Sequence, residues 1–142
     1  MTSTARKIRV ENQAHVAVST YESVRDSAGQ AAVRPFTVLL IKPWQKAQDP
    51  SYGPPLGILT LAACLRQHFG DKVTVHVRDM LLYNEEPAAL VPLLEQYHPD
   101  VVGVSALNCE ARASYEIAAI VKAWNPQAVT VLGGIHGTFM YQ

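Results

Sequence analysis

The chain has 142 residues, of which 49% are hydrophobic and 17% are charged, and twelve basic side chains balance twelve acidic ones. This length fits one domain, and the apolar fraction is high enough for a buried core, which excludes a wholly disordered chain. The zero net charge argues against a nucleic-acid-binding protein and against a polybasic membrane-surface protein, because both need a basic face.

The chain contains two cysteines, Cys64 and Cys109, which is too few for a disulfide framework, and they do not form a CxxC pair. We therefore expect no structural zinc or cluster site and a reduced, cytoplasmic setting. Cys64 falls on the inner half of a helical pattern and is expected to pack in the core. No apolar run approaches the roughly 20 residues that cross a bilayer, and no secretory signal follows the N-terminus.

Residues 1–34 differ in composition from the rest of the chain, because they contain no proline, a single glycine and few large apolar side chains. This composition predicts a mobile N-terminal extension, although a short strand between Ile8 and Val18 is also possible. The remaining residues, 35–142, are predicted to form the folded domain.

From Phe36 onward, apolar runs and helical patterns alternate. Phe36–Ile41 is continuously apolar, which predicts a strand buried on both faces in the middle of a parallel sheet. A loop rich in proline and glycine, Lys42–Pro55, leads to a helix predicted over Leu56–Phe69, with Gly70 as its stop. Four residues recur at the spacing of one helical face and are expected to point inward: Ile58, Ala62, Leu65 and Phe69.

The next two elements are a strand and a helix. Val73–Asp79 alternates strictly between apolar and polar residues, which predicts a strand nearer the edge of the sheet. Glu85–Tyr97 has the pattern of a helix, but Pro92 lies inside it, so this helix must start late or bend.

The last part of the chain repeats the alternation. Asp100–Ser105 predicts a strand buried on both faces, Glu110–Trp124 a helix, and Ala128–Leu132 a fourth strand. The residues after it, Gly133–Thr138, are expected to form a loop.

This order predicts an α/β fold with a doubly wound parallel sheet, Rossmann-like and flavodoxin-like, joined by right-handed crossovers. Four strands are present, whereas a flavodoxin-like sheet has five, so we expect the domain to be incomplete at Gln142. Such sheets bind ligands at the carboxyl ends of their strands. Residues 42–55, 105–110 and 133–138 are therefore predicted to line the site.

Several common ligand sites can be eliminated. A dinucleotide site needs GxGxxG directly after the first strand, but this chain has Gly53–Gly57 with two prolines, which remove backbone N–H donors. Asp79 could hold a ribose, but it stands alone. A P-loop is absent, and Ser105–Ala106 does not supply the acceptor aspartate of a receiver domain. Ser105 also lacks a GxSxG elbow, and the five histidines lack metal-ligand spacing, so we predict no catalytic residue and no protein-bound metal ion.

Three motifs remain, Pro54–Leu65, Pro99–Ala106 and Val131–Thr138. From Phe36 to Gln142 the chain resembles the N-terminal cobalamin-binding domain of cobalamin-dependent radical S-adenosylmethionine enzymes. The segment Thr130–Tyr141 is most similar to anaerobic magnesium-protoporphyrin IX monomethyl ester oxidative cyclases.

The resemblance implies a module that positions cobalamin for a radical S-adenosylmethionine barrel domain in the same or a partner chain, of methyltransferase or oxidative cyclase type. A stand-alone module that senses cobalamin or a tetrapyrrole without catalysis is the alternative. An unrelated nucleotide-binding α/β domain is the third possibility.

The resemblance also implies which residues bind the cofactor. In this fold the nucleotide tail of cobalamin enters a slot beside the sheet, which requires residues without side chains and a small hydroxyl group. We therefore expect a bulky residue in place of Gly134 to block the slot. A tight turn for the glycines and a helix-capping role for Ser105 are the alternatives. The implied cofactor-binding residues are Pro54, Pro55, Leu56, Ser105, Ala106, Leu107, Gly133, Gly134, Ile135 and His136.

Two motifs found in related cobalamin-binding proteins and radical enzymes are missing from this chain. Residues 42–55 contain no histidine, so the Asp-x-His-x-x-Gly motif whose histidine ligates cobalt is missing, which implies displaced-tail cobalamin without that ligand. Trp44 and Tyr52 could instead pack beneath the corrin or anchor the loop, and His136 could contact the cofactor or begin a helix. The CxxxCxxC motif is also missing, so the 4Fe–4S cluster and S-adenosylmethionine are expected in the catalytic domain only.

Overall fold

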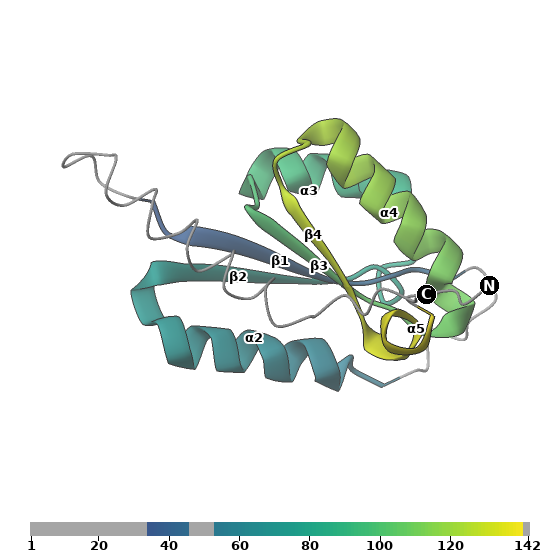
Figure 1. The fold of residues 1–142 in the computed structure, drawn as a ribbon, viewed down its shortest axis with the longest axis horizontal. Helices are drawn as coiled ribbons and strands as arrows, with labels where there is room; N and C mark the ends of the chain where they lie inside the picture. Colours follow the sequence, from purple (N-terminus) through teal and green to yellow (C-terminus); the bar gives the residue numbers. More distant parts are fainter. Residues whose placement is uncertain (1–33, 46–52, 141–142) are drawn as a thin grey trace, which may run out of the picture. The chain divides into compact units, whose positions relative to one another are not determined.

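The computed structural model describes residues 34–45 and 53–140, and these form a four-stranded sheet with flanking helices (Figure 1). All strand pairs are parallel, and the order is β2-β1-β3-β4. This confirms the predicted doubly wound α/β fold. Predictions for residues 1–33, and that for Tyr52, lie outside the described residues. The strands are β1 (Phe36–Lys42), β2 (Val73–Asp79), β3 (Val101–Ser105) and β4 (Val129–Gly133).

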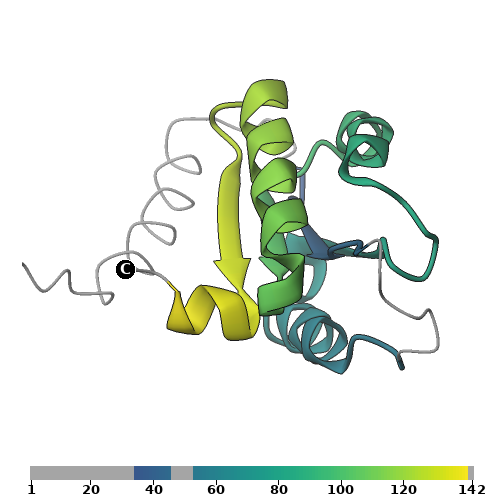
Figure 2. The same ribbon diagram turned by 90° about the vertical axis from the view of Figure 1, so that its right-hand side faces the viewer.

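The helices cover the sheet from both sides (Figures 1 and 2). One helix packs on β1 and β2, and two others pack together on the opposite face. The second predicted helix does start late: a 3₁₀ turn over Pro87–Ala89 precedes it, and Pro92 sits in its first turn, where no backbone N–H is needed. The helices are α2 (Leu56–Phe69), α3 (Leu90–Tyr97), α4 (Ala111–Trp124) and α5 (Gly134–Phe139).

The strand order places a topological switch between β1 and β3. From β1 the chain runs through α2 to β2 on one side, whereas from β3 it runs through α4 to β4 on the other. The two connections diverge at the carboxyl ends of β1 and β3, where Lys42 and Ser105 lie. Doubly wound sheets bind their ligands at this point.

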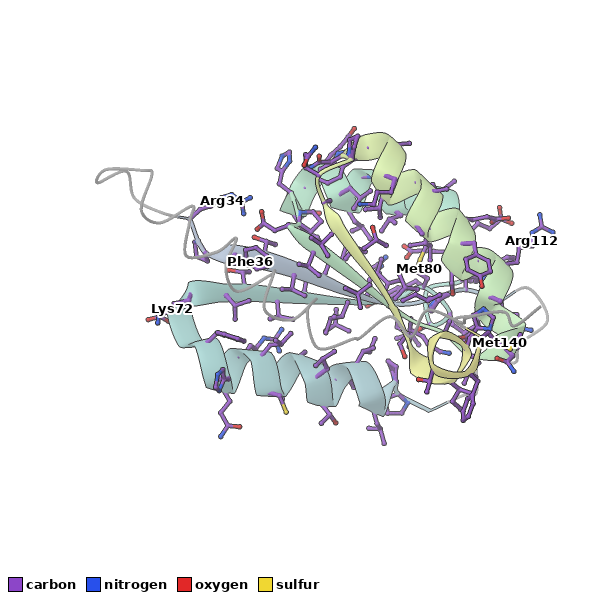
Figure 3. The ribbon with its side chains drawn as sticks, in the orientation of Figure 1. Arg34, Phe36, Lys72, Met80, Arg112 and Met140 are labelled. Carbon is purple, nitrogen blue, oxygen red and sulfur yellow. The ribbon has the colours of Figure 1, made fainter. Side chains whose placement is uncertain are left out.

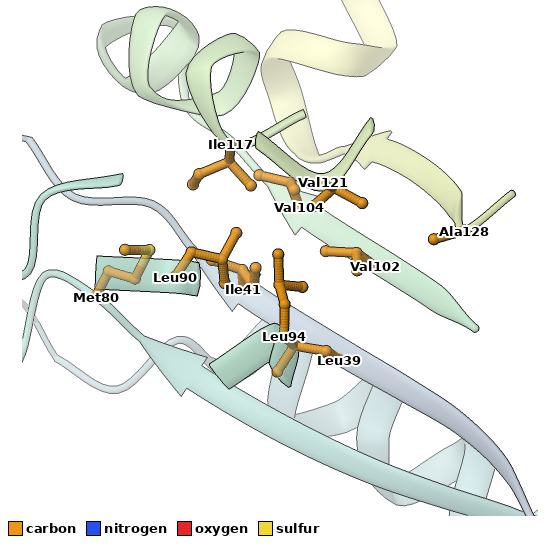
Figure 4. Close-up of a cluster of buried hydrophobic side chains, with 10 residues drawn as sticks. All are labelled: Leu39, Ile41, Met80, Leu90, Leu94, Val102, Val104, Ile117, Val121 and Ala128. Atoms are coloured by element: carbon orange, nitrogen blue, oxygen red, sulfur yellow. The ribbon is translucent and has the colours of Figure 1, made fainter. Parts of the chain in front are cut away.

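The larger core lies between the sheet and the pair α3 and α4 (Figure 4). Leu39 and Ile41 of β1 meet Leu94 and Ile117 there, and all four are fully buried. A smaller cluster lies under α2, where Leu40 packs against Ile58. Both faces of β1 are therefore buried, as its apolar run predicts. Each such side chain stabilises the fold by about 1.5–3 kcal/mol relative to leaving it exposed.

Two positions in α2 differ from expectation. Cys64 is exposed, because it lies two residues after the buried Ala62 and is therefore on the opposite side of the helix, away from the sheet. Phe69 is 45% exposed, because it is the last residue of the helix, where its ring contacts His68 edge-on. The predicted inner face is thus confirmed for Ile58 and Ala62, whereas the core position of Cys64 is wrong.

The face of β3 and β4 on the α2 side is more open than predicted. Val102 and Val104 of β3 are buried against α3 and α4, whereas Gly103 and Ser105 are only half-buried. In the described part of the chain, α2 packs on β1 and β2 rather than on β4, and Val131 is 49% exposed. Strand β3, which was predicted to be buried on both faces, is therefore fully buried only on the face toward α3 and α4.

His76 makes the stability of the domain depend on pH. Its ring stacks on that of Tyr97, with centroids 3.9 Å apart, and burial, followed by the positive charge of Arg66, lowers the pKa of His76 below its usual value of 6.5. The unfolded chain therefore binds a proton at His76 more tightly than the folded chain does. The contribution of His76 to the unfolding free energy is fully present above pH 6.5 and is lost as the pH falls from 6.5 through the lower pKa of the folded state. We expect His76→Phe, which keeps a stacked ring, to flatten the fall in unfolding free energy between pH 7 and pH 5. Urea unfolding at both pH values measures this, and an unchanged slope would contradict it.

Candidate functional site

The carboxyl ends of β3 and β4 bring several predicted site residues together. Ser105 pairs with Gly133 across the two strands. The backbone N–H of Ala106 donates to the carbonyl oxygen of Gly133 at 3.1 Å, and that of His136 donates to the carbonyl oxygen of Ala106 at 3.0 Å. These four residues therefore form one hydrogen-bonded junction where the sheet meets α5, with Ala106 and His136 buried in it.

Gly134 makes the turn from β4 into α5. The structure corrects the predicted loop over Gly133–Thr138, because α5 begins directly at Gly134. The φ of Gly134 is +78°, a conformation that glycine adopts without penalty, so the strand becomes a helix without a connecting loop. A Cβ atom at Gly134 would lie 2.7 Å from the carbonyl oxygen of Ala106. A bulky residue there would thus collide with the protein itself, which corrects the expectation that it simply fills the slot.

Gly133 offers the open position instead. Among the described residues, the nearest atom to a Cβ at Gly133 is the carbonyl oxygen of Val104, at 3.9 Å. Ser105, Val131 and Gly133 lie on the α2-side face of β3 and β4, and we call them the open strip. No hydrogen bond within the described ranges engages the hydroxyl of Ser105. The open strip therefore combines bare backbone with a free hydroxyl.

Sequence reasoning missed Gly103, which lies on the same face but is covered by Leu40. A Cβ at Gly103 would lie 2.8 Å from Cδ2 of Leu40 on the neighbouring strand. The signal was available, because a lone glycine inside a strand often marks a close approach of a ligand or of another chain segment.

The other predicted residues lie around this strip. Pro54, Pro55 and Leu56 begin α2, at the same end of the sheet as α5 in both views (Figures 1 and 2). Leu56 and Ile135 are 68% and 54% exposed. They supply apolar surface that a ligand can cover, but in the part of the chain that the structure describes no hydrogen bond joins the start of α2 to β3 or β4.

An ion pair crosses the switch point between β1 and β3. Lys42 ends β1, and its Nζ donates to Oε1 of Glu110, whose side chain is fully buried. The other carboxylate oxygen of Glu110 accepts from the backbone N–H of Leu107 at 2.8 Å. Glu110 therefore fixes the turn after β3, including the predicted site residue Leu107, against the end of β1.

His136 is enclosed by protein groups, with 6% of its surface exposed. Its Nε2 lies 2.8 Å from the hydroxyl of Tyr115, and its Nδ1 lies 3.2 Å from Oδ1 of Asn108. Both ring nitrogens thus have partners within the chain. Sequence reasoning identified His136 but neither of its partners.

Trp44 anchors the loop after β1, which was one of its two expected roles. Its Nε1 donates to Oδ1 of Asn84 at 2.8 Å, and its ring packs against the larger core. Trp44 and Cys109 line an open pocket of about 350 Å³ beside α4. Arg112 also lines it and extends outward from the start of α4 (Figure 3).

The described residues contain neither a candidate metal site nor a candidate membrane span. No group of three or more His, Cys, Asp or Glu side chains there could hold a metal ion. No helix there is long and apolar enough to cross a membrane.

Comparisons with known proteins identify the family. Residues 46–142 match the model of the B12 binding domain. An uncharacterized methyltransferase of Pyrococcus horikoshii is 30% identical over 87 residues, which is 61% of this chain and 18% of that protein. The anaerobic magnesium-protoporphyrin IX monomethyl ester cyclase of Rubrivivax gelatinosus is 35% identical over 89 residues, 62% of this chain and 16% of that protein.

This chain thus spans less than a fifth of either relative. No solved structure matches it at a significant level. The similarity to the cyclase confirms the resemblance expected from the sequence. Since the family model matches well over half of a chain whose sheet and strand ends have the expected form, the chain belongs to the B12 binding domain family.

Proposed function

We propose that this chain holds cobalamin at the carboxyl ends of its strands and positions it for a radical S-adenosylmethionine domain of methyltransferase or oxidative cyclase type. The observation that carries the proposal is the open strip. Gly133 presents backbone without a side chain on this face, and the free hydroxyl of Ser105 lies on the neighbouring strand, where Ser105 pairs with Gly133. A flat nucleotide tail needs such a surface, and a hydroxyl can donate to its ring nitrogen or accept from its amides.

The residues around the strip supply the remaining contacts. Pro54, Pro55 and Leu56 at the start of α2 and Ile135 of α5 offer exposed apolar surface. Ala106 and Leu107 offer backbone atoms in a turn that Glu110 holds in place. Burying apolar surface of this kind contributes about 25 cal/mol per Å² to binding.

Cobalt supplies the chemistry when cobalamin is bound, as a carrier of methyl groups or of electrons. The protein's part is to orient the cofactor and to exclude the wrong axial ligand. Residues 42–55 contain no histidine, and both ring nitrogens of His136 are held by the protein. We therefore propose a displaced tail with no histidine on cobalt.

The catalytic parts are proposed to lie outside this chain. Cys64 and Cys109 are free and far apart in the sequence, so the 4Fe–4S cluster and S-adenosylmethionine belong to another domain of the parent enzyme, working in the reducing cytoplasm. The names of the two relatives, a methyltransferase and a cyclase, support these reaction types.

A visible absorbance titration of the purified chain with hydroxocobalamin, followed by desalting, tests the proposal. We expect a corrin spectrum to remain with the protein at one equivalent, with band positions that show no histidine on cobalt. A second titration uses the chain extended beyond Gln142. Loss of the corrin from both proteins would contradict the proposal.

A further inference from the structure

We propose that Asn108, Tyr115 and His136, which we call the histidine clamp, set α5 against the turn after β3 before any ligand arrives. Tyr115 and Asn108 are then positioning residues for the cobalamin slot, although they need not touch the cofactor. The inference rests on the proposed function for its ligand. The arrangement of the clamp can be tested without that ligand.

The clamp joins three separate segments of the chain. Asn108 begins the 3₁₀ turn Asn108–Glu110, which follows β3, while Tyr115 lies on α4 and His136 lies in α5. The hydroxyl of Tyr115 is 2.8 Å from Nε2 of His136, and the two rings meet edge to face, with centroids 5.6 Å apart. Oδ1 of Asn108 is 3.2 Å from Nδ1. One imidazole therefore ties the segment after β4 to two segments that come after β3.

The partners also fix the tautomer of His136. A side-chain amide oxygen can only accept, so Nδ1 must carry a hydrogen atom that it donates to Asn108. In the neutral imidazole, Nε2 then accepts from the hydroxyl of Tyr115. The assignment makes Asn108 and Tyr115 chemically distinct: one must accept and the other must donate.

Polar contacts, rather than apolar burial, hold α5 in place. This helix has six residues, too few to be stable by itself, and no side chain caps its first turn. Its large apolar residues Ile135 and Phe139 are 54% and 71% exposed. The one buried residue of α5 is His136, whose backbone N–H also donates to Ala106. The clamp is therefore the main side-chain attachment of α5 to the described part of the domain.

The position of α5 decides whether the slot is formed. Gly134, the first residue of α5, has its backbone against Ala106 and Ser105. If α5 moves away, Gly134 no longer packs against Ser105 and Ala106 in the same arrangement, although Gly133 stays paired with Ser105 in the sheet. A smaller fraction of molecules then has a slot that can accept the tail. The apparent affinity falls in proportion to the fraction of molecules in which α5 is docked. The loss appears in the association rate, because the bound state keeps its contacts.

The test compares the full chain with three variants at the clamp. Tyr115→Phe removes the hydroxyl and keeps the ring, Asn108→Ala removes the acceptor, and Asn108→Asp retains an acceptor oxygen. Tyr83→Phe is the matched control, since Tyr83 lies in the turn after β2. We measure association and dissociation of hydroxocobalamin by stopped-flow absorbance. Hydrogen exchange of the His136 amide is measured in the ligand-free chain.

We expect Tyr115→Phe and Asn108→Ala each to weaken the docking of α5 about fivefold, the factor that corresponds to one net hydrogen bond, to slow association by up to that factor, and to leave dissociation unchanged. The His136 amide should exchange faster by a similar factor. Asn108→Asp should retain most of the association rate, and Tyr83→Phe all of it.

Other outcomes would overturn the proposal in distinguishable ways. Unchanged association and amide exchange in Tyr115→Phe would show that the clamp does not position α5. Faster dissociation with unchanged association would make Tyr115 a ligand contact instead. Asn108→Asp behaving like Asn108→Ala would contradict the assigned tautomer. If the wild-type chain retains no cobalamin, the proposed function fails, while amide exchange in the variants still decides whether the clamp exists.

Discussion

Replacing Gly133 with leucine should leave the domain folded and abolish its retention of cobalamin. A Cβ atom at this position meets no atom nearer than 3.9 Å among the described residues beyond its chain neighbours, so we expect the fold to accept a side chain there. The same side chain would project over the open strip, beside the hydroxyl of Ser105, and would occupy the surface proposed for the tail. We expect the affinity to fall by at least about a hundredfold, or about 2.7 kcal/mol. The absorbance titration measures the affinity, and circular dichroism melting checks the fold.

Two variants serve as controls for Gly133→Leu. Ala119→Leu adds a leucine to the exposed side of α4 and should change neither affinity nor melting temperature. Gly134→Ala should lower the melting temperature, because the residue has a φ of +78° and its Cβ would collide with the backbone of Ala106. A folded Gly133→Leu variant that binds hydroxocobalamin as tightly as the wild type would contradict the assignment of the slot.

Replacing Lys42 with methionine should strongly destabilise the domain. The carboxylate of Glu110 is fully buried and has two partners, Nζ of Lys42 and the backbone N–H of Leu107. Methionine keeps the apolar stem of lysine but leaves the buried charge without its counterion. Breaking such a pair typically costs about 3–5 kcal/mol, a large share of the roughly 5–15 kcal/mol that stabilises a domain. Urea unfolding followed by circular dichroism gives the free energy.

The double variant Lys42→Met/Glu110→Gln separates charge from packing. Glutamine carries no charge and keeps an oxygen for the N–H of Leu107, so the double variant should recover more than half of the lost stability. Recovery of nothing would mean that the stem of Lys42, rather than its charge, matters. A loss below about 1 kcal/mol in Lys42→Met would be typical of a surface pair and would contradict the structural role.

The strands and the longer helices could be predicted because their signals are local. Phe36–Ile41 is apolar throughout, and the structure buries it on both faces. Val73–Asp79 alternates, and the structure places it at the edge of the sheet. Each pattern reflects the surfaces that one element must cover, so neighbouring residues carry enough information.

Elements that depend on distant contacts were less predictable. The short helix α5 contains two glycines, which favour a loop in any local analysis, and it forms where His136 finds partners on other segments. The exposure of Cys64 depends on which stripe of α2 faces the sheet, and a helix with many apolar residues leaves that choice open.

The polar part of the site is the least visible in the sequence. Lys42 and Glu110 are 68 residues apart, and Tyr115 and His136 are 21 apart, so no motif links them. The glycines and Ser105 stood out because bare backbone and a small hydroxyl at strand ends have few structural uses. The residue types that support them have many possible structural roles, and only the contacts in the folded protein decide which role each residue takes.

The strand pairing also bears on the order of assembly. β1 pairs with segments far away in the chain, Phe36 with Val73 and Val38 with Val101, whereas β3 and β4 are joined by the shorter segment between Val101 and Val129. Closing a shorter loop costs less conformational entropy, and long-range pairing slows folding. Closing the unit β3–α4–β4 thus costs the least conformational entropy of the strand pairings, and this unit already brings Ser105 beside Gly133. The open strip is thus encoded in one contiguous stretch, onto which we expect the apolar strand β1 to dock later.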